Sequence, residues 1–222
     1  MVKVFLDAGH GGRDPGALGS GLKEKDINLS VALRVGELLT NKGIEVAHSR
    51  TDDRFVDLAD RAAMANGFGA HLFLSIHCNG FSNPSARGVE TYCYPSNSKG
   101  QKLAKLIQDS IVSRLSMTNR GVKEANFAVL RLTYMPAALV EMGFITSKGD
   151  AYILKDKQED LSRAIAEGIL NYLQIPYTDD KPPLYRVQVG AFRIRSNAEK
   201  LVEELKVKGY DAIIVNSKGK TN

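Results

Sequence analysis

A short run at residues 72–77, Leu-Phe-Leu-Ser-Ile-His, constrains the fold of this chain more than any other segment. Its nearly continuous apolar character is typical of a strand that is buried on both faces of a parallel sheet. Such a strand needs helices on both sides of its sheet. The run therefore predicts an α/β fold.

Strand-like and helix-like segments alternate through the first 175 residues. Short apolar segments predict five more strands, at residues 2–6, 44–47, 88–94, 127–130 and 137–140. Apolar residues that recur every three or four positions predict helices at residues 24–43, 56–66, 103–115 and 161–173. Residues 7–23 are too rich in glycine and polar residues for regular structure. We therefore predict a mostly parallel six-stranded sheet that is covered by helices on both faces.

The composition changes after Leu173. Three prolines and mixed charges mark residues 176–184 as a stiff, exposed linker between a first domain, residues 1–175, and a tail, residues 185–222. The tail has strand patterns at residues 185–189 and 210–215 and a helix pattern at residues 197–208. We expect a small, incomplete α+β unit, because a single strand-helix-strand rarely builds a stable core.

Length and charge exclude several classes of protein. The chain has 222 residues, enough for one well-filled core and a small appendage. Its apolar stretches fall far short of the roughly 20 residues that a membrane-spanning helix needs, so we expect no membrane insertion. The net charge of +5 favours anionic partners. No basic stripe is interleaved with aromatic residues, so nucleic acid is not an expected partner.

Four polar residues follow or end predicted strands or open a predicted helix. His10 follows the first strand, Glu24 opens the first helix, His77 ends the strand at residues 72–77, and Glu141 ends the strand at residues 137–140. In an open α/β sheet, ligands bind beyond the carboxyl ends of the strands. A catalytic Zn²⁺ takes three ligands of the His/His/Glu kind and keeps a position for water. A separate carboxylate can then move the water's proton. The pattern therefore favours metal-assisted amide hydrolysis.

Each of these residues also has a simpler interpretation. A lone histidine is more often a surface or core residue than a ligand, and Glu24 could serve the helix dipole. For Glu141 a purely structural interpretation is the weakest of the four, because a carboxylate at an apolar strand end needs a partner or a functional role. For Arg50, Asp52 and Arg61 we expect structural ion pairs rather than substrate contacts.

Several blocks of sequence together resemble the zinc-dependent N-acetylmuramoyl-L-alanine amidases of the amidase 3 type. The blocks are residues 7–12 (Asp-Ala-Gly-His-Gly-Gly), 24–26 (Glu-Lys-Asp), 75–79 (Ser-Ile-His-Cys-Asn), 120–123 (Arg-Gly-Val-Lys) and 136–144. The resemblance implies Zn²⁺ bound by His10, Glu24 and His77, with Glu141 as the catalytic residue. It also implies cleavage of the amide that joins the lactyl group of muramic acid to L-alanine in peptidoglycan.

The tail resembles the first half of a SPOR domain, a module that binds peptidoglycan, through residues 185–192 and the pattern Ala198, Leu201, Leu205, Gly209 and Tyr210. Two other functions stay open: a zinc peptidase acting on stem peptides, and a wall-binding protein without activity. The first residues lack a secretory signal. We therefore expect synthesis in the cytoplasm and action on the wall after lysis or release through a pore. A monomer is favoured, and a phage lysis enzyme and a sporulation-stage or other autolysin fit equally well.

Overall fold

The computed structural model describes residues 1–178, 187–210 and 212–215. The chain divides into two compact units, Met1–Tyr177 and Thr178–Asn222. No helix among the described residues is long and apolar enough to cross a membrane.

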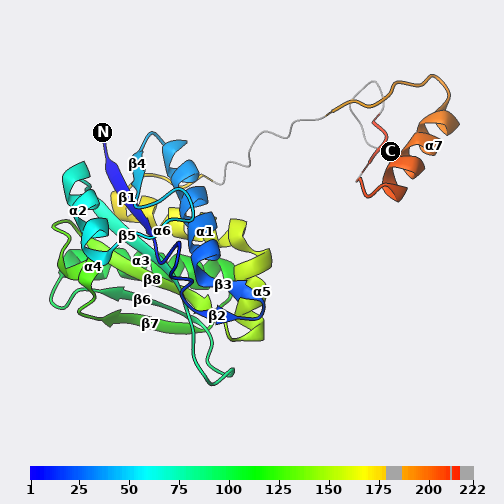
Figure 1. Ribbon diagram of the computed structural model, residues 1–222. Coiled ribbons are helices and arrows are strands. Elements are labelled where there is room, and N and C mark those ends of the chain that lie inside the picture. The colour runs from blue at the N-terminus through cyan, green and yellow to red at the C-terminus, as the bar shows by residue number, and fades with distance from the viewer. Residues whose placement is uncertain (179–186, 211, 216–222) are drawn as a thin grey trace. The chain divides into compact units, whose positions relative to one another are not determined.

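A six-stranded sheet forms the middle of the first unit (Figure 1). Its strands are β1 (Lys3–Ala8), β4 (Glu45–His48), β5 (Leu72–Asn79), β6 (Val89–Cys93), β7 (Asn119–Glu124) and β8 (Ala137–Phe144). They lie in the order β4-β1-β5-β8-β6-β7. The first four strands of this order are parallel, whereas β6 is antiparallel to β8 and parallel to β7. The predicted mostly parallel sheet is confirmed.

Helices cover both faces of the sheet. They are α1 (Glu24–Thr40), α2 (Leu58–Phe68), α3 (Ser98–Leu115), α4 (Ala128–Arg131), α5 (Lys148–Asp156) and α6 (Gln158–Leu173). The larger hydrophobic cluster joins one face, including Leu6, Leu74 and Val140, to α1, α3 and α6. Each of these helices places an apolar residue on the sheet every three or four positions, as Ile27, Val31 and Val35 do in α1.

The opposite face carries a smaller cluster, in which Phe5, Phe73 and Leu139 pack against α2 and α4. Side chains alternate between the two faces along a strand, so His77 and Glu141 project on this same face. Helix α4 has only four residues. The cover is therefore short here, and His77 and Glu141 stay partly exposed.

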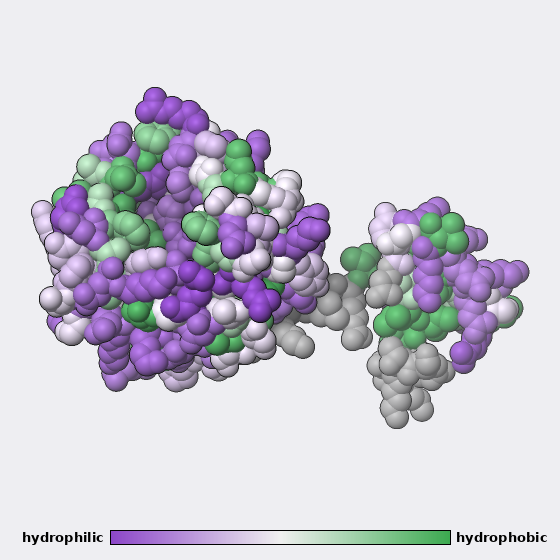
Figure 2. Space-filling view, turned by 90° about the horizontal axis from the view of Figure 1, so that it is seen from below, coloured by the Kyte–Doolittle hydropathy of each residue, from purple (hydrophilic) through white to green (hydrophobic). Residues whose placement is uncertain are grey.

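The surface of the first unit has no single apolar face in the view of Figure 2, where hydrophobic residues form patches among hydrophilic ones. Exposed apolar side chains in this unit include Leu18, Phe81 and Tyr134. Scattered residues of this kind are ordinary for a folded protein.

One predicted strand was wrong. Residues 127–130 contribute to helix α4 instead, because a four-residue apolar run is too short for its pattern to separate a strand from a helical turn. The sixth strand is β7, whose residues are all exposed or only partly buried. An edge strand of this kind lacks the apolar alternation that identifies strands in a sequence. The loop at residues 7–23 also contains a small hairpin, β2 (Leu18–Gly19) with β3 (Leu22–Lys23), and α5 was not predicted.

In the second unit, helix α7 (Arg195–Val207) agrees with the predicted helix at residues 197–208. In the described parts of the two predicted strands, residues 187–189, 210 and 212–214 lie outside any strand, and Val215 forms only an isolated bridge. Residues 185, 186 and 211 of those strands, and 179–184 of the predicted linker, lie outside the described residues. Two short strands alone make a marginal sheet, which explains why these described residues are not paired as strands.

Two buried arginines hold the loop that follows β1. The guanidinium of Arg61 donates hydrogen bonds to Asp7 Oδ1 at 2.7 Å and to the carbonyl oxygens of Ala8 at 2.6 Å and His10 at 2.8 Å. Ser75 Oγ donates to the second oxygen of Asp7 at 2.7 Å. Asp7 and Arg61 are 0% and 2% exposed. The expected structural ion pair of Arg61 is thus present.

Arg50 acts on the same loop through backbone oxygens rather than through an ion pair. Its Nε donates to the carbonyl of Ala8 at 3.0 Å, and its Nη2 donates to the carbonyls of Gly9 at 3.0 Å and Lys25 at 2.7 Å. The loop after β1 and the first turn of α1 are thereby tied together. Asp52 forms its ion pair with Arg54, at 3.7 Å.

Arg61→Gln removes the positive charge that compensates buried Asp7. We expect the free energy of unfolding to fall by about 3–5 kcal/mol, because an uncompensated buried charge is left behind. Urea titration followed by circular dichroism measures this. Arg34→Gln, at an exposed ion pair with Glu159, is the matched control and should cost at most about 1 kcal/mol. Equal losses in the two variants would contradict the structural role given to Arg61.

Candidate metal centre and catalytic carboxylate

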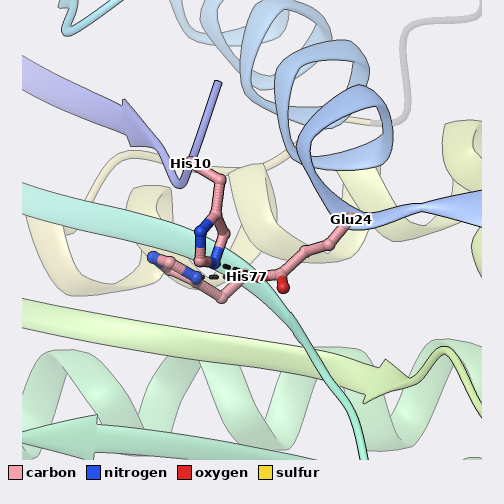
Figure 3. A group of neighbouring side chains, drawn as sticks. All are labelled: His10, Glu24 and His77. Atoms are coloured by element: carbon pink, nitrogen blue, oxygen red, sulfur yellow. Dashed lines mark hydrogen bonds and ion pairs between the residues drawn. The ribbon is translucent and has the colours of Figure 1, made fainter. Parts of the chain in front are cut away.

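The side chains of His10, Glu24 and His77 point toward one another from three different elements (Figure 3). His10 lies just after β1, Glu24 is the first residue of α1, and His77 lies near the end of β5. One ligand atom from each of them lies within 4.8 Å of the other two. Strands β1 and β5 are parallel neighbours, so the two histidines reach the same edge of the sheet.

Glycines make room for this convergence. A Cβ on Gly9 would lie 2.2 Å from the ring of His77, and a Cβ on Gly16 would lie 2.5 Å from Glu24 Oε2 and 2.7 Å from the ring of His10. Distances this short do not occur between real atoms of this kind. Gly9 and Gly16 are therefore required for steric reasons, because the backbone of the loop approaches the side chains of the cluster too closely for any Cβ atom.

The carboxylate of Glu24 is the centre of the cluster. His10 Nε2 lies 3.1 Å and His77 Nδ1 lies 2.9 Å from its Oε1. The amide nitrogens of Ala17 and Cys78 donate to the two carboxylate oxygens at 2.7 and 3.0 Å. Burial would raise the pKa of Glu24, but the hydrogen bonds and charges of the two histidines outweigh it and hold that pKa well below its usual range.

The histidines shift in the opposite direction. Burial would lower the pKa of His10, but hydrogen bonds and charges from Glu24 and Asp14 outweigh burial and raise it to about 9. The pKa of His77 is likewise raised, because Glu24 and the charge of Glu141 overcome the effect of burial. In this arrangement both rings carry a proton toward one carboxylate. A metal cation between His10, His77 and Glu24 would be bound by all three side chains, and both imidazole rings would then be neutral.

This donor set fits Zn²⁺. Two imidazole nitrogens and one carboxylate oxygen are a ligand combination typical of catalytic zinc sites. His10 Nδ1 also contacts Asp14 Oδ2, at 2.8 Å. A carboxylate behind a metal-binding histidine is the usual arrangement, because it orients the ring and sets its tautomer. Asp14 was not singled out in the sequence, since nothing in the spacing of the loop distinguishes it from other turn residues.

Glu141 lies beside this cluster. In the parallel pairing of β5 and β8 it stands opposite His77. Its Oε2 is buried and has no hydrogen-bond partner among the described residues. Burial, together with the negative charges of Glu24 and Glu90, outweighs the two histidines and raises the pKa of Glu141 to about 7. A carboxylate with such a pKa can both accept and release a proton near neutral pH.

Asn79 contacts another buried carboxylate, that of Glu90 in β6. The Asn79 Nδ2 donates to Glu90 Oε1 at 2.9 Å, and the Asn79 Oδ1 accepts from the amide nitrogen of Gly80 at 3.0 Å. Arg120 and Lys123 of β7 also bond to Glu90. The sequence offered little sign of this group, because Glu90 lies inside a strand pattern.

The chain matches two known families. The family described as N-acetylmuramoyl-L-alanine amidase (Amidase_3) matches residues 4–171, and the SPOR domain matches residues 140–222. The sporulation-specific N-acetylmuramoyl-L-alanine amidase of Bacillus subtilis is 40% identical over 220 residues, 97% of this chain and 85% of the relative. The endolysin of Bacillus phage SPP1 is 41% identical over 81% of this chain and 72% of its own length.

Solved structures agree with these matches. The amidase AmiC2 of Nostoc punctiforme superposes with a TM-score of 0.75 at 39% identity, covering 78% of this chain and 97% of that one. An N-acetylmuramoyl-L-alanine amidase of Clostridium difficile gives a TM-score of 0.74 at 40% identity, with the same coverage. The fold, the order of the sequence blocks and these relatives agree, and the chain belongs to the Amidase_3 family of N-acetylmuramoyl-L-alanine amidases.

Proposed function

We propose that this chain hydrolyses the amide between N-acetylmuramic acid and L-alanine in peptidoglycan, using Zn²⁺ held by His10, Glu24 and His77 and a proton moved by Glu141. One observation carries the proposal. A His/His/Glu cluster of the zinc type lies directly beside a buried carboxylate oxygen that has no partner in the described part of the chain.

When bound, Zn²⁺ supplies Lewis acidity, which polarises a carbonyl and makes a water molecule acidic enough to attack near neutral pH. Glu24 supplies negative charge, and Asp14 orients the ring of His10 through the contact at Nδ1. Arg50 and Arg61 hold the backbone of the loop that carries His10. These residues therefore position the ligands without touching the substrate.

Glu141 is the group that moves protons in this proposal. Its carboxylate accepts a proton from the attacking water while the new C–O bond forms at the amide carbon. The same proton then passes to the nitrogen of L-alanine as the C–N bond breaks, so the peptide leaves as a neutral amine. A pKa of about 7 suits both transfers, because a general base and acid works best when its pKa lies near the working pH.

For the organisation of the chain, we propose a catalytic domain at residues 1–175, a linker at residues 176–184 and a wall-binding module at residues 185–222. The match of the SPOR family to the end of the chain supports the last of these. A wall-binding protein without activity is disfavoured, because a domain without catalysis has no physical reason to keep a buried, unpaired carboxylate beside a metal cluster.

The purified protein should contain about one Zn²⁺ per chain, because three ligands of the right kind converge. His77→Ala should lose most of this metal and the wall-hydrolysing activity. Elemental analysis with a parallel assay on purified walls measures both. His71→Ala is the control, since His71 lies outside the cluster and accepts a hydrogen bond from the Lys3 amide. Full activity after exhaustive chelation would contradict the zinc assignment.

Glu141→Gln should keep Zn²⁺ and the fold but lower kcat by roughly 10²- to 10⁴-fold, because a carboxamide of equal size cannot accept the water's proton. Mass spectrometry of products from defined muropeptides gives the rate and also the bond that is cut. An amidase releases peptides with a free L-alanine amine, whereas a peptidase cuts within the stem peptide. Glu37→Gln, at an exposed position of α1, serves as the control. A normal rate for Glu141→Gln would reject the assigned role.

Deleting residues 178–222 should leave hydrolysis of small soluble muropeptides unchanged. Every proposed ligand and catalytic residue, and both hydrophobic clusters of the described residues, lie in the first unit. Binding to intact wall should weaken, because the deletion removes the part of the SPOR match that lies beyond the first unit. Parallel assays with a soluble muropeptide and with sedimented walls separate the two effects. Loss of activity on the small substrate would show that the tail supports catalysis.

A further inference from the structure

A second cluster of charged residues lies on the other side of Glu141 from His77. Its centre is Glu90, which is 3% exposed. Besides the bond from Asn79, the carboxylate accepts hydrogen bonds from Tyr92 Oη at 2.7 Å, Arg120 Nε at 2.5 Å and Lys123 Nζ at 2.6 Å. Four donors thus converge on one buried carboxylate.

The register of the sheet places this cluster next to the proposed catalytic residue. In the antiparallel pairing of β6 and β8, Glu90 stands directly opposite Glu141. Side chains at such positions project on the same face, with their Cβ atoms about 4.5–5.5 Å apart. His77, Glu141 and Glu90 therefore form a row across three neighbouring strands, and Arg120 and Lys123 continue it from β7.

The cluster has one positive charge more than Glu90 can compensate. Arg120 and Lys123 both bond to the same oxygen of Glu90, and their side chains are 35% and 39% exposed. Burial would raise the pKa of Glu90, but bonds from Lys123, Arg120 and Tyr92 lower it, so this carboxylate is ionised. Two cations on a single anion leave a net charge of +1 at the surface beside Glu141.

The guanidinium of Arg120 is held in a fixed position and has N–H groups that are not used in strong hydrogen bonds. Its carbon lies 4.9 Å from the centre of the Phe144 ring, and its Nε is bonded to Glu90. Its Nη1 reaches only the carbonyl oxygen of Arg87, at 3.5 Å. Among the described residues, its Nη2 has no hydrogen-bond partner. A fixed guanidinium with unused N–H groups is suited to binding a carboxylate.

We propose that Arg120 and Lys123 bind a free carboxylate on the residue that follows L-alanine in the stem peptide, and that Glu90 positions both cations. This inference rests on the proposed amidase function. The N-acetylated sugars next to the scissile amide are neutral, so the anionic groups of the substrate lie on the peptide side. An extended peptide advances about 3.3–3.6 Å per residue. This carries the carboxylate toward the side chains of Arg120 and Lys123, which reach from β7 back to Glu90 on β6, the strand next to that of Glu141.

A purely structural role for the cluster makes a different prediction. If Arg120 only stabilised Glu90 and the edge strand β7, its loss would slow all substrates alike. Two muramoyl tripeptides distinguish a structural role from a substrate-binding role. They differ only at the residue after L-alanine, which carries a free α-carboxylate in one substrate and a carboxamide in the other. The values of kcat and KM are measured on both for the zinc-loaded full chain.

We expect the kcat/KM of the wild-type chain to be about tenfold or more higher on the carboxylate substrate than on the carboxamide substrate, mainly because KM is lower. A difference of this size corresponds to one charge-assisted hydrogen bond. In Arg120→Gln the preference should fall to near one, and Lys123→Gln should reduce it as well. Lys105→Gln is the matched control. It removes an exposed charge on α3, which covers the opposite face of the sheet, and should keep the full preference.

Equal kcat/KM of the wild-type chain on the two substrates would overturn the carboxylate site while leaving the amidase function intact. The same holds if Arg120→Gln slows both substrates equally and so keeps the preference. If Arg120→Gln does not fold, the wild-type preference and Lys123→Gln decide the question. Hydrolysis of neither tripeptide by the wild-type chain would instead reject the proposed function itself.

Discussion

The register between neighbouring strands is the constraint on which the rest of this molecule depends. Ala8 pairs with Ile76, His77 pairs with Glu141, and Glu141 pairs with Glu90. Because side chains alternate between faces, a slip of one residue would turn a whole set of side chains to the other face. The apolar residues on the opposite face oppose any slip, since they would leave the larger cluster. Core packing therefore holds the polar row in place.

The interior also carries charge, and each buried charge has a defined partner or a proposed task. Arg61 compensates Asp7, and Arg50 binds backbone oxygens of the same loop. Glu24 is surrounded by donors, and Glu90 holds two cations. Glu141 is the one of these groups with a task instead of a full set of partners, since one of its buried oxygens has no hydrogen-bond partner in the described residues. An unpaired buried carboxylate reduces stability, and a proton-transfer role accounts for its presence.

The row of side chains from His77 to Arg120 makes the two sides of the site chemically different. On one side of Glu141 lie groups suited to holding a cation, and on the other lies a surface with excess positive charge. A substrate with a neutral sugar part and an anionic peptide part is oriented by such an arrangement. The short α4 leaves this row accessible, whereas α1, α3 and α6 close the other face.

The sequence by itself determined the α/β class, through the apolar run at residues 72–77 and the helical spacing of Ile27, Val31 and Val35, and it indicated His10, Glu24, His77 and Glu141. Hydrophobic periodicity and metal-type residues at strand ends are local signals. Strand β7, helix α4 and the Glu90 cluster were decided only by tertiary structure. An edge strand buries no complete face, and a four-residue run fits either a strand or a helical turn. The cluster exists because β6 and β7 pair and so bring together Glu90 and Arg120, which are 30 positions apart in the sequence, and no local pattern records such a pairing.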